Sequence, residues 1–191
     1  PSSIIFQKSN LVGIDYINNI SNLIIRISEN KDLCFILFPN ASNSLSSKKL
    51  RNNDLPIIDM IQKKLYSKGF NQERVLFVTK NINTDGVRSL ISECDITIVS
   101  RFHAMIASIS LSVPTLVIAW GHKYLEVMKS FNMENLVFDF KKQEYNLVES
   151  VINMIKDRIR YKSIISQKLP IIEEDARKQF NYIFREFYTN D

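Results

Sequence analysis

Short β-branched runs alternate with longer segments of helical period along most of the chain. A brief continuous apolar run is typical of a buried strand, whereas apolar residues at three- and four-residue steps are typical of a helix. The runs that predict strands are 3–7, 33–38, 74–78, 95–99, 114–119 and 136–138. The segments that predict helices are 14–30, 55–68, 84–92, 102–111, 123–132 and 143–160.

This order of elements predicts an α/β fold. Residues 96–99, Ile-Thr-Ile-Val, show no strong apolar and polar alternation, as expected where helices cover both faces of a parallel sheet. We expect a Rossmann-like three-layer sandwich with a mostly parallel, doubly wound sheet over residues 1–160. Residues 161–191 read as helix alone, with a restart at Pro170, and predict a helical extension that packs on this domain or on a second one.

The polar segment 39–54 interrupts this rhythm and is long for an ordinary connection. It follows a predicted strand, so it lies at the carboxyl edge of the sheet, where ligands bind in open α/β folds. Two interpretations stay open, a substrate lid and a mobile surface excursion.

Composition and charge narrow the class of partner. The chain is 45% hydrophobic and 24% charged, as in ordinary globular proteins, and its net charge of +5 is spread thinly. A mild, dispersed positive charge favours an anionic small molecule or an anionic membrane surface as the binding partner over nucleic acid. No apolar run approaches the roughly 20 residues of a membrane span, and the chain opens without a signal-peptide core. We expect a cytoplasmic location, including the cytoplasmic face of the membrane.

The strand-to-helix junction at residues 99–103 is the most informative place in the sequence. A buried strand gives way to a helix at Ser100, so unpaired N–H groups and the positive end of the helix dipole meet there. Arg101 adds a planar cation and His103 a group that titrates near neutral pH. Together they predict an anion site; the alternative is a serine cap with a surface arginine and a satisfied histidine.

A second junction follows the predicted strand 114–119. There His122 and Lys123 lead into a helix, and pairing of the two strands brings both loops to one crevice. Lys123 is then expected to be a second phosphate contact; the alternative is that it is simply an exposed lysine in a first turn. His122 is a weaker candidate for ligand binding. Trp120 is expected to lie either in the core or in a wall of the crevice.

Several familiar sites are excluded. The sequence has no Gly-x-Gly-x-x-Gly, no Walker loop and no Gly-x-Ser-x-Gly elbow. Its two histidines and two cysteines have no metal-ligand spacing, so we expect no metal and read Cys34 and Cys94 as reduced core residues.

Residues 94–107, Cys-Asp-Ile-Thr-Ile-Val-Ser-Arg-Phe-His-Ala-Met-Ile-Ala, then 112–119 and Lys123, resemble the C-terminal half of the polysaccharide pyruvyl transferase family. In that family a strand ends in Ser-x-Arg-x-His or close to it. Here Ser100 and Arg101 are adjacent, and Ser112 stands where glycine is usual. The sharp resemblance covers about residues 90–130.

The resemblance implies a two-domain enzyme similar to GT-B glycosyltransferases, of which this chain is the donor-binding C-terminal half without its N-terminal domain. Such enzymes transfer a pyruvyl group from phosphoenolpyruvate to a saccharide, or a lipid-linked saccharide, as a ketal during cell-surface polysaccharide synthesis. The donor is a substrate, so no cofactor is implied, and the isolated domain is expected to bind without turnover.

The resemblance also assigns roles. Arg101 and His103 match the active-site pair and Lys123 the downstream basic residue; we expect His103 to be the general acid and base, Arg101 an anion clamp and Ser100 part of a phosphate cradle. The family often has Pro-His where this chain has Pro39-Asn40, and Asp54 is a counterpart of its later aspartate. We therefore count Asn40, Asp54 and His122 with the substrate-binding residues.

Two alternatives are kept. One is a GT-B glycosyltransferase that uses a nucleotide-sugar donor at the same anion site. The other is a saccharide-binding domain that kept the fold and lost the chemistry, which Asn40 favours because an amide cannot titrate in place of histidine.

Overall fold

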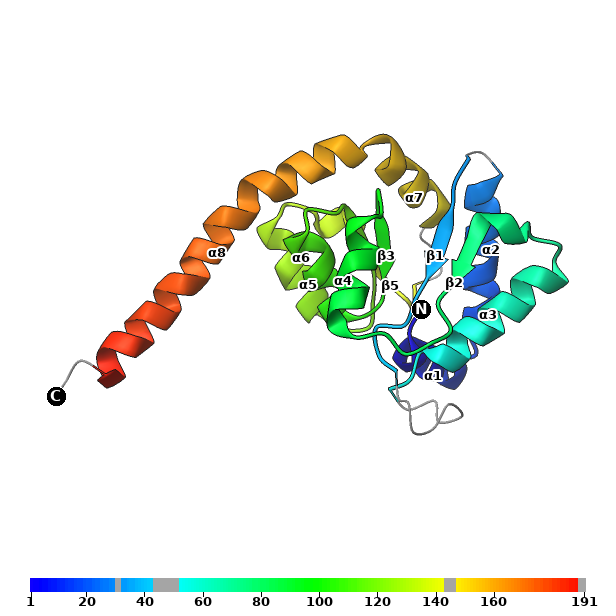
Figure 1. Cartoon of the computed structure of the whole chain (residues 1–191), viewed down its shortest axis with the longest axis horizontal. Helices are drawn as coiled ribbons and strands as arrows, with labels where there is room; N and C mark the ends of the chain where they lie inside the picture. The colour runs from blue at the N-terminus through cyan, green and yellow to red at the C-terminus, as the bar shows by residue number, and fades with distance from the viewer. Residues whose placement is uncertain (30–31, 43–51, 143–146, 189–191) are drawn as a thin grey trace.

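The computed structural model describes residues 1–29, 32–42, 52–142 and 147–188 (Figure 1). In chain order its elements are α1 (Ser3–Leu11), α2 (Tyr16–Ser28), β1 (Phe35–Leu37), α3 (Leu55–Ser67), the 3₁₀ turn η1 (Gln72–Arg74), β2 (Val75–Phe77), α4 (Thr84–Ser92), β3 (Thr97–Val99), α5 (Phe102–Ser110), β4 (Thr115–Ala119), α6 (Lys123–Ser130), the 3₁₀ turn η2 (Glu134–Leu136), β5 (Val137–Asp139), α7 (Leu147–Lys156) and α8 (Arg158–Tyr188).

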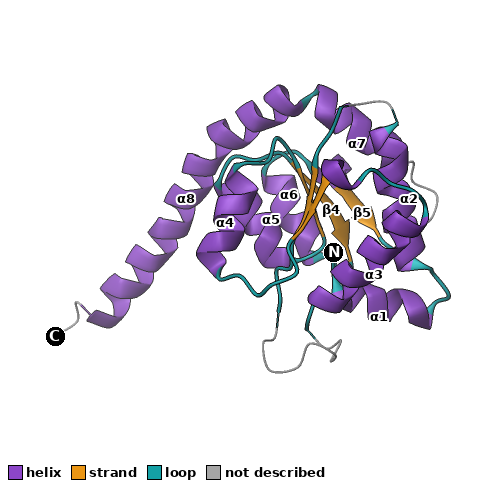
Figure 2. Cartoon of the chain, turned by 45° about the vertical axis from the view of Figure 1, so that its right-hand side comes forward, coloured by secondary structure: helices purple, strands orange, loops and turns teal. Residues whose placement is uncertain are grey.

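All the described strand pairs are parallel. β1 pairs with β2, and β3, β4 and β5 form a second ladder in that order, with Val99 opposite Val117. Helices α4, α5 and α6 lie on one side of the strands and α2, α3 and α7 on the other (Figure 2). The predicted α/β class and Rossmann-like layering are therefore confirmed.

One hydrophobic cluster joins both ladders to the helices on either side. It contains Leu37 and Val75 of the first ladder, Leu116 of the second, Ile27 of α2 and Met105 of α5. Every residue of β4 is buried, which agrees with the continuous apolar run that predicted it. A shared core of this kind fixes the carboxyl ends of the strands and the helix starts beside them.

The first predicted strand is wrong, because residues 3–7 belong to α1. The run Ile-Ile-Phe is too short for periodicity to distinguish strand from helix. The deciding signal is local: the Ser2 hydroxyl accepts the N–H of Ile5 and caps the helix. The other five predicted strands and the six helices match described elements to within a few residues at their ends, apart from the part of the predicted helix 143–160 that lies outside the described residues.

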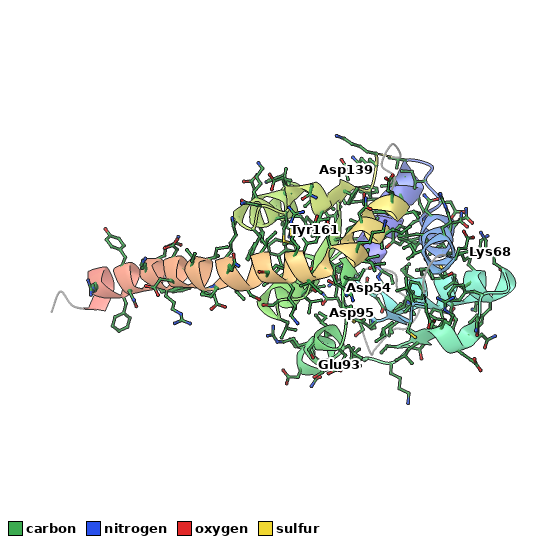
Figure 3. All side chains as sticks on the ribbon, turned by 90° about the horizontal axis from the view of Figure 1, so that it is seen from above. Asp54, Lys68, Glu93, Asp95, Asp139 and Tyr161 are labelled. Atoms are coloured by element: carbon green, nitrogen blue, oxygen red, sulfur yellow. The ribbon has the colours of Figure 1, made fainter. Side chains whose placement is uncertain are left out.

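Helix α8 runs through Pro170 without a break, so the predicted restart there is wrong. Pro170 is exposed, and water can hydrogen-bond the carbonyl that a proline in a helix leaves free. Tyr161 and Ile165 bury the start of α8 against the body, while the far end stands away from it (Figures 1 and 3). The division of the chain at residue 160 stays a prediction.

The polar segment 39–54 is described only at its ends, since 43–51 lie outside the described residues. Those ends are held together: the N–H of Asp54 donates to the carbonyl of Ala41 at 2.7 Å. The choice between a lid and a surface excursion stays open.

Candidate functional site

The two predicted junctions meet at one edge of the second ladder. β3 ends at Val99 and α5 begins at Phe102, whereas β4 ends at Ala119 and α6 begins at Lys123. Because β3 and β4 are paired and parallel, both junctions lie at their shared carboxyl edge. The side chains there form two groups, one buried and one exposed.

The buried group is centred on an ion pair between Arg101 and Asp54, which we call the buried layer. Arg101 Nε and Nη2 donate to Asp54 Oδ2 and Oδ1 at 3.2 and 2.6 Å. Nη2 also donates to Ser3 Oγ and Nη1 to Asn52 Oδ1, each at 2.9 Å. These four hydrogen bonds engage all but one of the N–H donors of the Arg101 guanidinium.

Asp54 connects three parts of the chain that are far apart in sequence. Besides Arg101, its carboxylate accepts the N–H of Ser3 at 2.8 Å and that of Ala41 at 3.1 Å. It is fully buried, and it lies within the body of the molecule in the view of Figure 3. The pair therefore ties the start of α1, the segment after β1 and the end of β3 to one another.

Ser100 belongs to the same buried layer. It is 5% exposed, and its carbonyl accepts a hydrogen bond from the Tyr124 hydroxyl at 3.2 Å. Its hydroxyl lies beside that of Tyr16, which accepts the N–H of Ser2 at 3.1 Å. Burial raises the pKa of Tyr16 to about 12 and also raises the pKa of Tyr124.

The exposed group lies on the first turns of α5 and α6, and we call it the exposed surface. His103 is exposed, and its ring meets the edge of Phe102 with the ring centres 6.1 Å apart. On the same aromatic ring, Lys123 Nζ lies 4.5 Å from the centre. His103 and Lys123 thus both contact Phe102.

Trp120 forms a wall of this exposed surface. It is half-buried, and Lys123 Nζ lies 5.3 Å from its ring centre. Its ring packs edge-on against Tyr124, which packs in the same way against Phe102. The aromatic side chains therefore stabilise the Lys123 ammonium group through cation–π contacts.

The helices that face this surface begin without a capping side chain. Ser2, Asp15 and Asn83 cap α1, α2 and α4 through their side chains, whereas the N-cap residues of α5 and α6, Arg101 and His122, make no such bond within the described chain. The alternative reading of Ser100 as the cap of α5 is wrong, since Arg101 holds that position and the Ser100 side chain is turned to Tyr16. First-turn N–H groups of α5 and α6 can therefore receive an anion.

The structure thus separates the predicted site residues. Ser100, Arg101 and Asp54 meet in the buried layer, while His103, Lys123 and His122 are exposed. Asn40 is half-buried and precedes Ala41, whose N–H binds Asp54. Direct contact of Arg101, Ser100 or Asn40 with a ligand stays a prediction.

Sequence reasoning missed Lys8, whose Nζ lies 5.2 Å from the ring centre of Trp120. The prediction of a strand over residues 3–7 left Lys8 without a place near the site. The Ser-Ser pair ahead of an apolar run was the available signal, because serine at that position is typical of a helix start.

A hollow of about 450 Å³ lies near the carboxyl end of β5, between α2, β5 and α7. Its polar lining includes Asp15, Asn19, Arg26 and Asp139. Carboxylates, an amide and a guanidinium can exchange hydrogen bonds with hydroxyl groups.

Metal ligands do not gather in the described part of the chain: no three His, Cys, Asp or Glu side chains come together there. Cys34 is exposed rather than in the core, and Cys94 is half-buried; both are free thiols. The helices described are all too short or too polar to cross a membrane.

The family model for polysaccharide pyruvyl transferase matches residues 3–122, more than half of the chain. The chain belongs to the polysaccharide pyruvyl transferase family. This confirms the resemblance found in the sequence and makes the protein a member of a transferase family. Comparison with curated proteins gave no match, nor did comparison with solved structures, so similarity to the GT-B fold stays a prediction.

The matched region covers the buried layer and most of the exposed surface. It includes α1 with Lys8, the ion pair of Asp54 and Arg101, and His103, and it ends one residue before Lys123. A single family model therefore spans the buried layer and most of the exposed surface of this polysaccharide pyruvyl transferase domain.

Proposed function

We propose that this domain binds phosphoenolpyruvate and takes part in transferring its pyruvyl group to two hydroxyls of a saccharide, as a ketal, in cell-surface polysaccharide synthesis. The observation that carries the proposal is the contact of both His103 and Lys123 with Phe102, beside two uncapped helix starts, in a chain of this family. A proton carrier and a cation beside N–H donors are what an anionic enol ester needs.

The proposed reaction balances as follows. One proton adds to C3 of phosphoenolpyruvate, and C2 becomes electron-deficient. Two saccharide oxygens bond to C2, and the bond from C2 to the phosphate oxygen breaks. Of the two hydroxyl protons released, one replaces the proton given to C3 and the other leaves with inorganic phosphate. The donor carries its own leaving group, so the reaction takes no cofactor.

Each predicted residue has a place in this scheme. His103 delivers the proton to C3 and takes a hydroxyl proton in return, because it is exposed and contacts the same aromatic ring as Lys123. Lys123 and the starts of α5 and α6 bind the phosphate or carboxylate. Arg101 and Asp54 hold the β3–α5 turn that carries His103.

The partners follow from the same scheme. The acceptor is a saccharide or a lipid-linked saccharide, whose hydroxyls Asn40 and His122 help to bind. A second, N-terminal domain completes the cleft, as in GT-B enzymes. The proposed location is the cytoplasm, with peripheral contact at the membrane surface favoured by the net charge of +5.

The direct test is a ketal-forming assay on the intact protein, which follows phosphate release and the labelled pyruvyl carbon. His103→Asn is expected to lower kcat by about 100-fold or more, since it removes the proton carrier. His122→Asn is the matched variant and is expected to raise KM with little change in kcat. Equal kcat in His103→Asn and the unchanged protein would contradict the assignment.

A nucleotide-sugar transferase is the second candidate, because two uncapped helix starts beside Lys123 also suit a diphosphate. Thermal shift separates the two, since a ligand that binds only the folded state raises stability with its concentration relative to Kd. Stabilisation by phosphoenolpyruvate and not by nucleotide sugars supports the pyruvyl transferase; the reverse supports the second candidate.

A further inference from the structure

Two lysines from distant parts of the chain meet at one aromatic ring. Lys8 Nζ, on α1, lies 5.2 Å from the ring centre of Trp120, and Lys123 Nζ, at the start of α6, lies 5.3 Å from it. Trp120 itself follows directly after β4. The two ammonium groups are therefore gathered at the carboxyl edge of the sheet, beside the exposed surface.

Neither ammonium group has a carboxylate partner in the described part of the chain. The ion pairs in that part of the chain join other cations, such as Lys63 with Asp59 and Lys129 with Glu126, and none includes Lys8 or Lys123. Contact with an aromatic face stabilises a cation by only about 0.5–1 kcal/mol at an exposed site. Two like charges on one ring also repel each other, so the pair leaves a positive potential that an anion would satisfy.

The surroundings strengthen this potential. Helix α6 begins at Lys123 without a capping side chain, so the positive end of its dipole adds to the two ammonium groups. Lys123 Nζ also lies 4.5 Å from the Phe102 ring centre, so two aromatic side chains hold its charge at the start of α6.

We propose that Lys8 and Lys123 form a two-lysine clamp for a small ligand that carries a carboxylate and a phosphate on a short carbon skeleton. Each ammonium group binds one of the two anionic groups, and the carbon skeleton between them packs against the face of Trp120. Lys8 is then a donor-binding residue that no motif of the sequence identifies. The choice of ligand rests on the proposed function, because phosphoenolpyruvate has this chemistry.

The test uses 2-phosphoglycolate, which carries a carboxylate and a phosphate but has no enol to react. It is titrated into the intact protein by calorimetry. Lys8→Met keeps the apolar stem on Trp120 and is expected to weaken binding about 10-fold, as is Lys123→Met. Lys8→Arg keeps the charge and is expected to stay within about threefold. Lys162→Met, an exposed lysine of α8, removes the same charge elsewhere and is expected to leave the affinity unchanged.

Two further probes test the ligand class. Inorganic phosphate can engage only one anionic group and is expected to bind more weakly than 2-phosphoglycolate. Pyrophosphate that binds more tightly than 2-phosphoglycolate would overturn the assignment of a carboxylate. Equal affinities of Lys8→Met and Lys162→Met for 2-phosphoglycolate would overturn the clamp. Melting curves confirm that each variant is folded, and Lys8→Gln replaces Lys8→Met where that variant does not fold.

Failure of the clamp and failure of the proposed function are distinguishable. Lys8-dependent binding of 2-phosphoglycolate without ketal formation in the intact protein supports the clamp and contradicts the function. Ketal formation with the same KM for phosphoenolpyruvate in Lys8→Met as in Lys162→Met supports the function and overturns the clamp. Where the clamp and the proposed function are both correct, Lys8→Met raises the KM for phosphoenolpyruvate about 10-fold and leaves kcat nearly unchanged.

Discussion

The buried layer and the exposed surface begin within two residues of each other, yet the structure uses them differently. Arg101 turns inward to Asp54, whereas His103 is exposed beside Phe102. Arg101 donates nearly all of its hydrogen bonds to other groups of the protein, whereas the ring of His103 lies at the surface. A motif that reads as one site therefore contains a buried, paired guanidinium and an exposed imidazole, and the two should respond differently to substitution.

The largest expected effect is in the buried layer. Asp54→Ala leaves the Arg101 guanidinium buried without its counter-ion and is expected to lower the free energy of unfolding by about 3–5 kcal/mol. Asp59→Ala is the control, because its pair with Lys63 is exposed and is expected to contribute less than about 1 kcal/mol. Urea denaturation measures both. Similar losses in the two variants would mean that the Asp54 pair is no more than a surface contact.

The second effect is on the pH dependence of stability. Burial raises the pKa of Tyr16 to about 12, so the folded state keeps a proton that the unfolded state loses near pH 10. Stability is therefore full below pH 10 and falls by up to about 3 kcal/mol as the pH rises from 10 to 12.

Tyr16→Phe tests this dependence. This variant loses the hydrogen bond from the Ser2 N–H, which is expected to lower the free energy of unfolding by about 1 kcal/mol. It is also expected to show little of the fall in stability above pH 10. Tyr182→Phe, at an exposed position of α8, should keep the decline of the unchanged protein. A decline that is equally steep in Tyr16→Phe would show that another group causes it.

The smallest effect is at the turn after α5. Ser112 has a φ of 56°, in the left-handed region where residues other than glycine are strained, and glycine is usual here in the family that the sequence resembles. Ser112→Gly is expected to raise the free energy of unfolding by about 1 kcal/mol. Asn132→Gly, at a φ of 55°, is the matched variant and should gain less, because asparagine tolerates this region. A loss of stability in Ser112→Gly would contradict the strain.

The sequence predicts the strands, the layering and the family well, and the contacts within the site less well. Short β-branched runs mark buried strands, and the residues around Arg101 carry the family pattern. The pairing of Arg101 with Asp54 spans 47 residues and depends on how segment 39–54 returns to the sheet, which no local pattern encodes. The approach of Lys8 to Trp120 depends on α1 being a helix, and a three-residue apolar run does not decide that.

The proposed function assigns donor binding to the exposed surface rather than to the buried layer. The most direct measurement is a calorimetric titration of phosphoenolpyruvate into the intact Lys123→Met protein, with its free energy of unfolding determined in parallel. The affinity of this variant is expected to be at least about 10-fold weaker, and its free energy of unfolding to stay within about 0.5 kcal/mol of that of the unchanged protein. Unchanged affinity, or weaker affinity only in proportion to lost stability, would contradict it.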